Sequence, residues 1–101
     1  MNVLDSSGWI EYFANGPNAD RFASVAVDAA TLLVPSIVLH EVFRWADREG
    51  GERAVAAMRA GLVIPLDADL AIAAARVARR HRLPTADSII YATALAHRAT
   101  V

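Results

Sequence analysis

The 101-residue sequence contains no cysteine, which excludes disulfide bonds and thiolate metal sites. A cysteine-free chain is typical of the reducing cytoplasm, and we expect a cytoplasmic location. No apolar run approaches the roughly 18 residues that cross a bilayer. The first residues also lack the basic and apolar regions of a signal peptide. We therefore expect no membrane partner.

Lysine is missing too, because all ten basic residues are arginines. They stand against eleven acidic residues, and the formal net charge of −1 excludes a generally basic nucleic-acid-binding protein. A local basic patch remains open. The arginine bias has two readings, which are the base composition of the genome and a use for bidentate contacts to phosphate.

Familiar catalytic patterns are absent as well. His40, His81 and His97 lack the paired spacing of a zinc site, so we expect them at the surface or in packing. No serine belongs to a recognisable pattern with a histidine and an acid. Gly50-Gly51 alone predicts a turn rather than a phosphate-binding loop. Acidic residues remain as the candidates for chemistry.

Apolar residues make up 55% of the sequence, which is enough for a sizeable core in one domain spanning residues 1–101. Periodicity predicts strands at residues 2–5, 31–34 and 62–66, with 100–101 resembling the opening of a fourth. It predicts a short helix that begins at residue 6 and is stopped by 15–18, then helices at 19–29, 37–49, 52–60, 68–81 and 86–98. This alternation indicates an α/β fold, a parallel sheet with helices on both faces. The last helix is apolar nearly all round and should be buried on more than one side.

Boundary residues refine these predictions. Ser36, Asp67 and Thr85 are expected to cap the helices that follow them. Gly61 is expected at a helix C-terminus, and Gly50-Gly51 is expected to break the helix at 37–49.

Three acids stand where a surface acid is not expected, and each has an ordinary reading beside a functional one. Asp5 follows the first strand, where an acid often only caps a helix. Glu41 lies beside an apolar stripe and could pair with Arg44 or Arg48. Asp87 lies in a first helical turn, where the helix dipole favours negative charge. All three are expected at the carboxyl end of the sheet, where ligands bind in such folds.

Carboxylates that converge without basic partners repel one another, and a divalent cation removes that cost. Ligands that are all oxygen indicate Mg²⁺ or Mn²⁺ rather than zinc. We therefore expect Asp5, Glu41 and Asp87 to form a metal site.

Three stretches resemble the PIN-domain ribonucleases, most closely the VapC-type toxins of bacterial toxin–antitoxin pairs. They are DSSGWIEYF at residues 5–13, PSIVLHEV at 35–42 and LPTADSIIYATA at 83–94. The resemblance implies a metal-dependent endoribonuclease that hydrolyses RNA and is bound by a cognate antitoxin. It also implies that Asp5, Glu41 and Asp87 are metal-binding catalytic acids, and that Ser7 supports the first of them.

The family pattern continues with a Thr-x-Asp motif on a fourth strand beside the first, and this sequence ends at Val101 without it. The expected fold therefore lacks the last strands of a PIN domain, and a non-catalytic antitoxin-binding module is the alternative function. An acidic-pocket phosphatase of the haloacid type fits less well, because Ser7 stands where its second acid is needed. We expect the open edge at residues 2–5 and the face at 89–95 to be covered by further chain, an antitoxin or a second copy in a homodimer or other oligomer.

Two further sets of residues have expected roles. Trp9 and Trp45 should lie in the core or face a partner. Arg76, Arg79 and Arg80 are candidates for holding RNA, the other reading being a solvated helix face.

Overall fold

The computed structural model describes residues 1–46 and 48–101. Within this part the elements follow in the order β1 (Asn2–Val3), α1 (Ser6–Phe13), α2 (Ala19–Ala26), the 3₁₀ turn η1 (Ala29–Thr31), β2 (Leu32–Pro35), α3 (Ser36–Trp45), α4 (Arg48–Arg59), β3 (Leu62–Ile64), α5 (Ala68–His81) and α6 (Thr85–Ala96). None of the helices described has the length and hydropathy needed to span a bilayer.

The strands form a parallel sheet in the order β1-β2-β3, which confirms the predicted α/β class. β2 is the central strand, and its four residues are all buried. Thr100 forms a parallel bridge with Asn2 on the other side of β1. The Val3 N–H donates to the Thr100 carbonyl at 2.7 Å, and the Thr100 N–H donates to the Met1 carbonyl at 2.9 Å. Part of the edge that was expected to be open is therefore paired within the chain.

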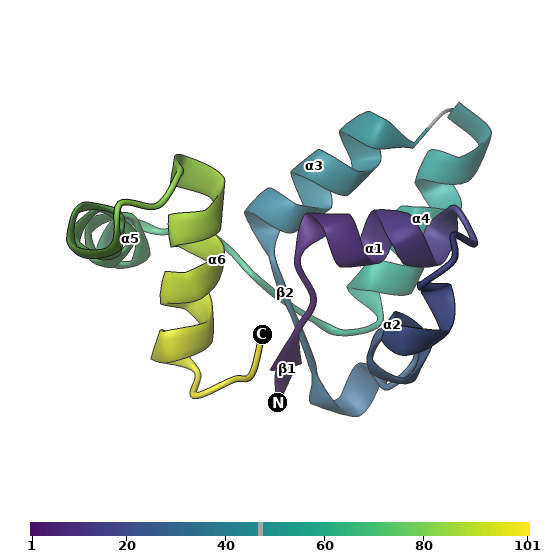
Figure 1. Ribbon diagram of the computed structural model, residues 1–101, viewed down its shortest axis with the longest axis horizontal. Helices are drawn as coiled ribbons and strands as arrows, with labels where there is room; N and C mark the ends of the chain where they lie inside the picture. Colours follow the sequence, from purple (N-terminus) through teal and green to yellow (C-terminus); the bar gives the residue numbers. More distant parts are fainter. Residues whose placement is uncertain (47) are drawn as a thin grey trace.

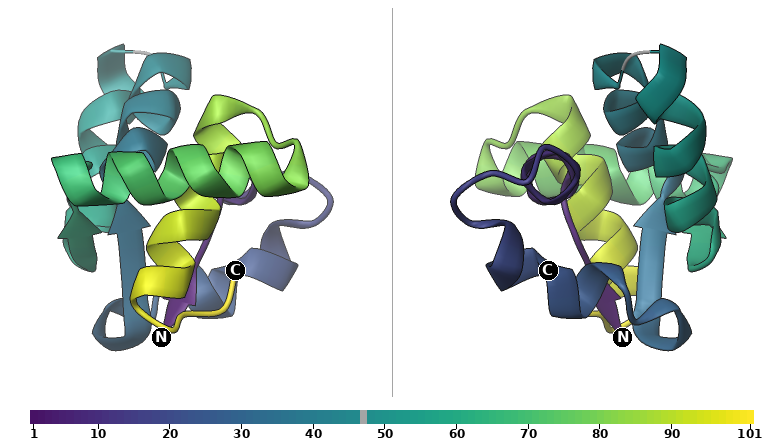
Figure 2. Two further views of the ribbon diagram at one scale, coloured as in Figure 1. Left: turned by 90° about the vertical axis from the view of Figure 1, so that its left-hand side faces the viewer. Right: turned by 90° about the vertical axis from the view of Figure 1, so that its right-hand side faces the viewer.

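Helices cover both faces of the sheet, as predicted. Figure 1 shows α5 and α6 on one side of β1 and β2, and α1 to α4 on the other. The main core lies between the sheet and α1, α3 and α4, where Trp9, Val38 and Met58 are fully buried. α6 packs between the strands and α5, with six buried residues along its length, so the prediction that it is covered on more than one side is confirmed. The two views of Figure 2 show α5 crossing outside α6.

The predicted break at Gly50-Gly51 is wrong, because both glycines lie inside α4. α3 ends earlier, at Trp45, where Ala46 takes an extended backbone conformation with φ −67° and ψ 140°. A Cβ on Gly51 would lie 3.1 Å from the Phe43 ring. Glycine at this position therefore lets α4 approach α3 closely, a tertiary requirement that a local pattern cannot distinguish from a turn.

Gly61 follows the end of α4, as predicted, and its N–H donates to the Met58 carbonyl at 3.1 Å, but its backbone conformation and its contacts were not predicted. No glycine in the described part has a positive φ, so Gly61 is not a left-handed cap. A Cβ on it would lie 2.9 Å from the Leu32 carbonyl oxygen, which is backbone and cannot move aside. Gly61 therefore allows the start of β3 to lie against β2.

Of the caps predicted at Ser36, Asp67 and Thr85, that at Asp67 is confirmed, and its side chain accepts the Leu70 N–H at 2.8 Å. Ser36 and Thr85 are instead the first residues of their helices, each following a proline at the cap position. The Ser36 hydroxyl accepts the Leu66 N–H at 3.2 Å, which ties the segment after β3 to the start of α3.

The remaining boundaries differ by a few residues. Strands β1 and β3 are shorter than predicted, since Leu4 and Pro65 lie outside them. α2 ends at Ala26, where η1 follows after a short turn, and α6 ends at Ala96. Of the predicted helix at 37–49, residue 47 lies outside the described residues, and residues 48 and 49 belong to α4.

Candidate active site

Asp5 lies at the carboxyl end of β1 and is the N-cap of α1. Its Oδ1 accepts two hydrogen bonds, from the Gly8 N–H at 2.9 Å and from the Ser7 hydroxyl at 3.0 Å. The capping reading of Asp5 is therefore confirmed, and Ser7, whose support of Asp5 the resemblance implies, contacts it. The second carboxylate oxygen forms no hydrogen bond with the described residues and is available for a ligand.

Asp87 lies in the first turn of α6, and its side chain is exposed. Within the part of the chain that the structure describes, it forms no hydrogen bond or ion pair. It lines a hollow of about 270 Å³ together with Asp5. The remaining lining residues are Leu83, Ile90, Tyr91 and Val101. We call this space the acidic hollow. The fold thus brings the first and the last predicted acid into one space.

Glu41 lies in the second turn of α3 and is half-buried. Its Oε1 accepts a hydrogen bond of 2.5 Å from the hydroxyl of Ser6, 35 residues away in sequence. Glu41 lines a separate hollow of about 330 Å³, together with Ser6, Ile10, Arg44 and Trp45. No ion pair with Arg44 forms, and the Arg48 side chain lies outside the described residues. The structure therefore places Glu41 in a hollow of its own rather than in the lining of the acidic hollow.

Ser6 is the residue of this site that sequence reasoning missed. Two neighbouring hydroxyls at the start of α1 hold two different acids, Ser7 holding Asp5 and Ser6 holding Glu41. The sequence signal was the pair of small hydroxyl residues directly after Asp5. The target of Ser6 is distant in sequence, so only the packing of α1 against α3 reveals it.

The three acids fit a hard divalent cation by their donor chemistry. Each carboxylate keeps at least one oxygen without a hydrogen bond, and no guanidinium or imidazole group of the described residues neutralises any of them. Oxygen donors of this kind suit Mg²⁺ or Mn²⁺. Among the residues described, however, no three Asp, Glu or His side chains are grouped closely enough to hold one ion together. Asp5 and Asp87 are the pair that shares a space.

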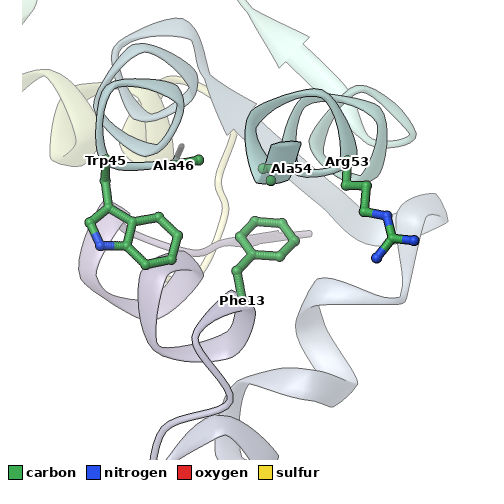
Figure 3. Close-up of a pocket in the computed structure, with 6 residues that line it drawn as sticks. Phe13, Trp45, Ala46, Arg53 and Ala54 are labelled. Atoms are coloured by element: carbon green, nitrogen blue, oxygen red, sulfur yellow. The ribbon is translucent and has the colours of Figure 1, made fainter. Parts of the chain in front are cut away.

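A second kind of hollow, of about 490 Å³, lies between the end of α1, the end of α3 and α4. Figure 3 shows the Phe13 ring and the Trp45 indole on either side of this space and the Arg53 side chain at its rim. Its other lining residues are Ala46, Gly50 and Ala54. We call it the aromatic hollow. The described residues that line it include no acid.

The two tryptophans differ in exposure. Trp9 is fully buried and stacks on Phe13 with ring centroids 5.5 Å apart, which confirms its predicted place in the core. Trp45 is 46% exposed and lines both the aromatic hollow and the hollow beside Glu41. Its predicted role at a partner interface stays a prediction.

Comparison with known proteins shows the family of the chain. No curated protein matches its sequence. The fold is similar to a solved structure described as a toxin–antitoxin complex from Klebsiella pneumoniae, with a TM-score of 0.84 and 24% identity, over 98% of this chain and 82% of that one. Residues 3–101 match the PIN domain family. This match spans nearly the whole sequence, and we conclude that the chain belongs to the PIN domain family.

Proposed function

We propose that this protein is a metal-dependent endoribonuclease of the VapC type, which hydrolyses RNA phosphodiester bonds as the toxin of a toxin–antitoxin pair. PIN domains are generally nucleases. The observation that carries the proposal is the acidic hollow, which both Asp5 and Asp87 line and in which neither pairs with a basic side chain of the described residues. Burial or capping alone gives no reason to bring two unneutralised acids together.

Asp5 and Asp87 would hold Mg²⁺ or Mn²⁺, which supplies an activated water and stabilises the charge that develops on the phosphate. The residues of the chain supply the positioning. The Gly8 N–H and the Ser7 hydroxyl both donate to one oxygen of Asp5. These two hydrogen bonds orient the carboxylate, and the other oxygen is left for the ion. Asp87 lies in the first turn of α6, where a negatively charged side chain interacts favourably with the helix dipole.

Glu41 is the third acid of the proposed site. The Ser6 hydroxyl donates to one of its oxygens, so Ser6 acts as a positioning residue for Glu41. Ser6 and Asp5 are neighbours in the chain, and the short hydrogen bond therefore links α3 to the segment that carries Asp5. We expect the site to work as an arrangement of three acids organised by the first turn of α1.

The alternative is an inactive PIN domain that only binds an antitoxin. It is favoured by the lack of a three-acid cluster among the described residues and by the aromatic hollow, where half-exposed Trp45 is separated from the acidic hollow. The similar solved structure is itself described as a toxin–antitoxin complex. We propose an antitoxin as protein partner under either function, and a homodimer or other oligomer as the assembled state.

The test is cleavage of a labelled single-stranded RNA by the purified chain with Mn²⁺, with and without EDTA. We expect EDTA to abolish cleavage and Asp87→Asn to lower its rate at least about 100-fold, the usual scale for losing a group that acts in the transition state. Asp69→Asn is the matched control, because Asp69 is also an exposed acid in a first helical turn.

Cleavage that survives EDTA, or equal rates in the two variants, would contradict the proposed chemistry. A wild-type chain that unfolds cooperatively and yet cleaves no RNA with Mg²⁺ or Mn²⁺ would select the antitoxin-binding module instead.

A further inference from the structure

The C-terminal end of α5 carries the longest run of basic residues in the sequence, which we call the cationic turn: Arg79, Arg80, His81 and Arg82. All four residues are exposed, and within the described residues none of their side chains forms a hydrogen bond or an ion pair. In a chain with a net charge of −1, this run is a concentrated positive surface that forms no ion pair with the described residues.

The cationic turn leads directly into the acidic hollow. Arg82 takes the left-handed conformation, with φ 53° and ψ 46°, and its N–H donates to the Ala78 carbonyl. The Leu83 N–H donates to the same carbonyl at 3.1 Å. The chain therefore reverses at Arg82, and the next residue, Leu83, already lines the hollow with Asp5 and Asp87. The left-hand view of Figure 2 shows this turn between the end of α5 and the start of α6.

A ring contact holds the cationic turn against α6. His81 meets Tyr91 edge to face, with centroids 5.7 Å apart and an interplanar angle of 72°. Tyr91 lines the acidic hollow and lies four residues after Asp87, so the two side chains are on the same side of α6. The Tyr91 side chain is 38% exposed, which leaves part of it free for another contact.

We infer that the cationic turn binds the phosphate backbone of single-stranded RNA and places the adjoining phosphodiester at the acidic hollow. This inference rests on the proposed function. Two unneutralised carboxylates repel a polyanion, so binding energy must come from cations outside the hollow. Arginine offers bidentate donors to phosphate. Tyr91 at the rim offers a ring on which an unpaired base can stack, which favours a single strand over a duplex.

The structure also shifts the set that sequence reasoning selected. Arg79 and Arg80 remain candidates for binding RNA. His81 and Arg82 are added, because Arg82 directly precedes Leu83, which lines the acidic hollow. Arg76 lies a turn earlier on α5 and has no such connection.

The experiment measures binding of a fluorescent 12-nucleotide single-stranded RNA by anisotropy, in EDTA, across a range of NaCl concentrations. We expect Arg80→Gln/Arg82→Gln to weaken binding at least about fivefold. The slope of log K against log salt should fall by about 1.4, since each lost phosphate contact to a single strand contributes about 0.7. The control is Arg21→Gln/Arg59→Gln, which removes two exposed arginines from α2 and α4, with an expected change below about twofold.

A second variant separates lost charge from lost structure. Arg82→Gly removes a cation, and glycine suits the left-handed conformation at this position better than arginine. We expect weaker RNA binding with an unchanged or higher melting temperature. A lower melting temperature together with weaker binding would be a structural effect and would overturn the assignment of Arg82.

Equal losses in the test and control pairs, or no loss in either, would overturn the inference. The inference would also be overturned if Arg80→Gln/Arg82→Gln weakened the binding of poly-glutamate as much as the binding of RNA, because the surface would then bind any polyanion. Binding in EDTA requires no cleavage, so a failure here is distinct from a failure of the proposed nuclease, which the Asp87→Asn rate decides.

Discussion

The β1–α1 junction and the first turn of α6 each contribute one acid to the acidic hollow, and the two regions hold their acids differently. At the junction, Asp5 is half-buried and receives two hydrogen bonds from its own helix start. On α6, Asp87 is exposed and has no hydrogen-bond partner among the described residues. The junction is thus organised by its own hydrogen bonds, whereas no hydrogen bond from the described residues fixes the Asp87 carboxylate. The comparison separates an acid with a role in the fold from one for which only a role in the proposed site is left.

The largest expected effect is on activity, and it should be the same in both regions. Asp5→Ala and Asp87→Ala should each lower the rate of RNA cleavage at least about 100-fold, because each removes a proposed metal ligand. Single-turnover cleavage with saturating Mn²⁺ measures this. An Asp87→Ala variant with near wild-type rates would remove α6 from the site.

Divalent metal should stabilise the folded chain by about 1–3 kcal/mol at millimolar concentration, since an ion that binds only the native state shifts the unfolding equilibrium. The shift should vanish in Asp87→Asn, whose backbone and neighbours are otherwise unchanged. Thermal melts with and without Mn²⁺ decide this. A shift of equal size in the variant would show that the ion binds elsewhere.

Stability without metal should differ between the two regions. Asp5→Ala should destabilise the fold by about 1 kcal/mol, the typical cost of losing an N-cap, and Asp5→Asn should restore most of it. Asp87→Ala should cost only about 0.3 kcal/mol through the helix dipole. Urea denaturation in EDTA compares the variants. Similar losses at both positions would mean that Asp87 has structural partners after all.

The smallest expected effects separate the two serines. Ser6→Ala should cost about 1 kcal/mol, because it leaves one oxygen of half-buried Glu41 without its hydrogen bond, while Ser7→Ala should cost less than about 0.5 kcal/mol at an exposed position. Ser6→Thr keeps the hydroxyl and should recover the stability. If Ser6→Ala and Ser7→Ala were equally mild, the Ser6–Glu41 contact would not organise the site.

The sequence was sufficient where a local pattern decides the structure. Asp67 before an alanine-rich periodic stretch predicted both the start of α5 and its end at His81, because capping and helix period are properties of neighbouring residues. The parallel order of the strands followed from their alternation with helices. Asp5 was located for the same reason, at a junction that its own residues define.

Other features depended on contacts between distant segments. Gly51 was expected to break a helix but lies inside α4, and Gly61 follows the end of α4 as expected. Each also provides room for a neighbouring segment, which only the packed structure shows. The hydrogen bond between Ser6 and Glu41 likewise spans 35 residues. Glu41 was selected as an acid in an apolar context, but its separation from the acidic hollow depends on how α1 lies against α3.

Helix α1 connects the proposed acidic site with the aromatic hollow. Its first turn carries the groups that hold Asp5 and Glu41, and its last residue, Phe13, lines the aromatic hollow. Eight helical residues span only about 12 Å, and a helix this short moves as a stiff rod. Because α1 moves as one body, Ser6, Ser7 and Phe13 keep their relative positions. The contacts to Asp5 and Glu41 therefore share one rigid support with a wall of the aromatic hollow.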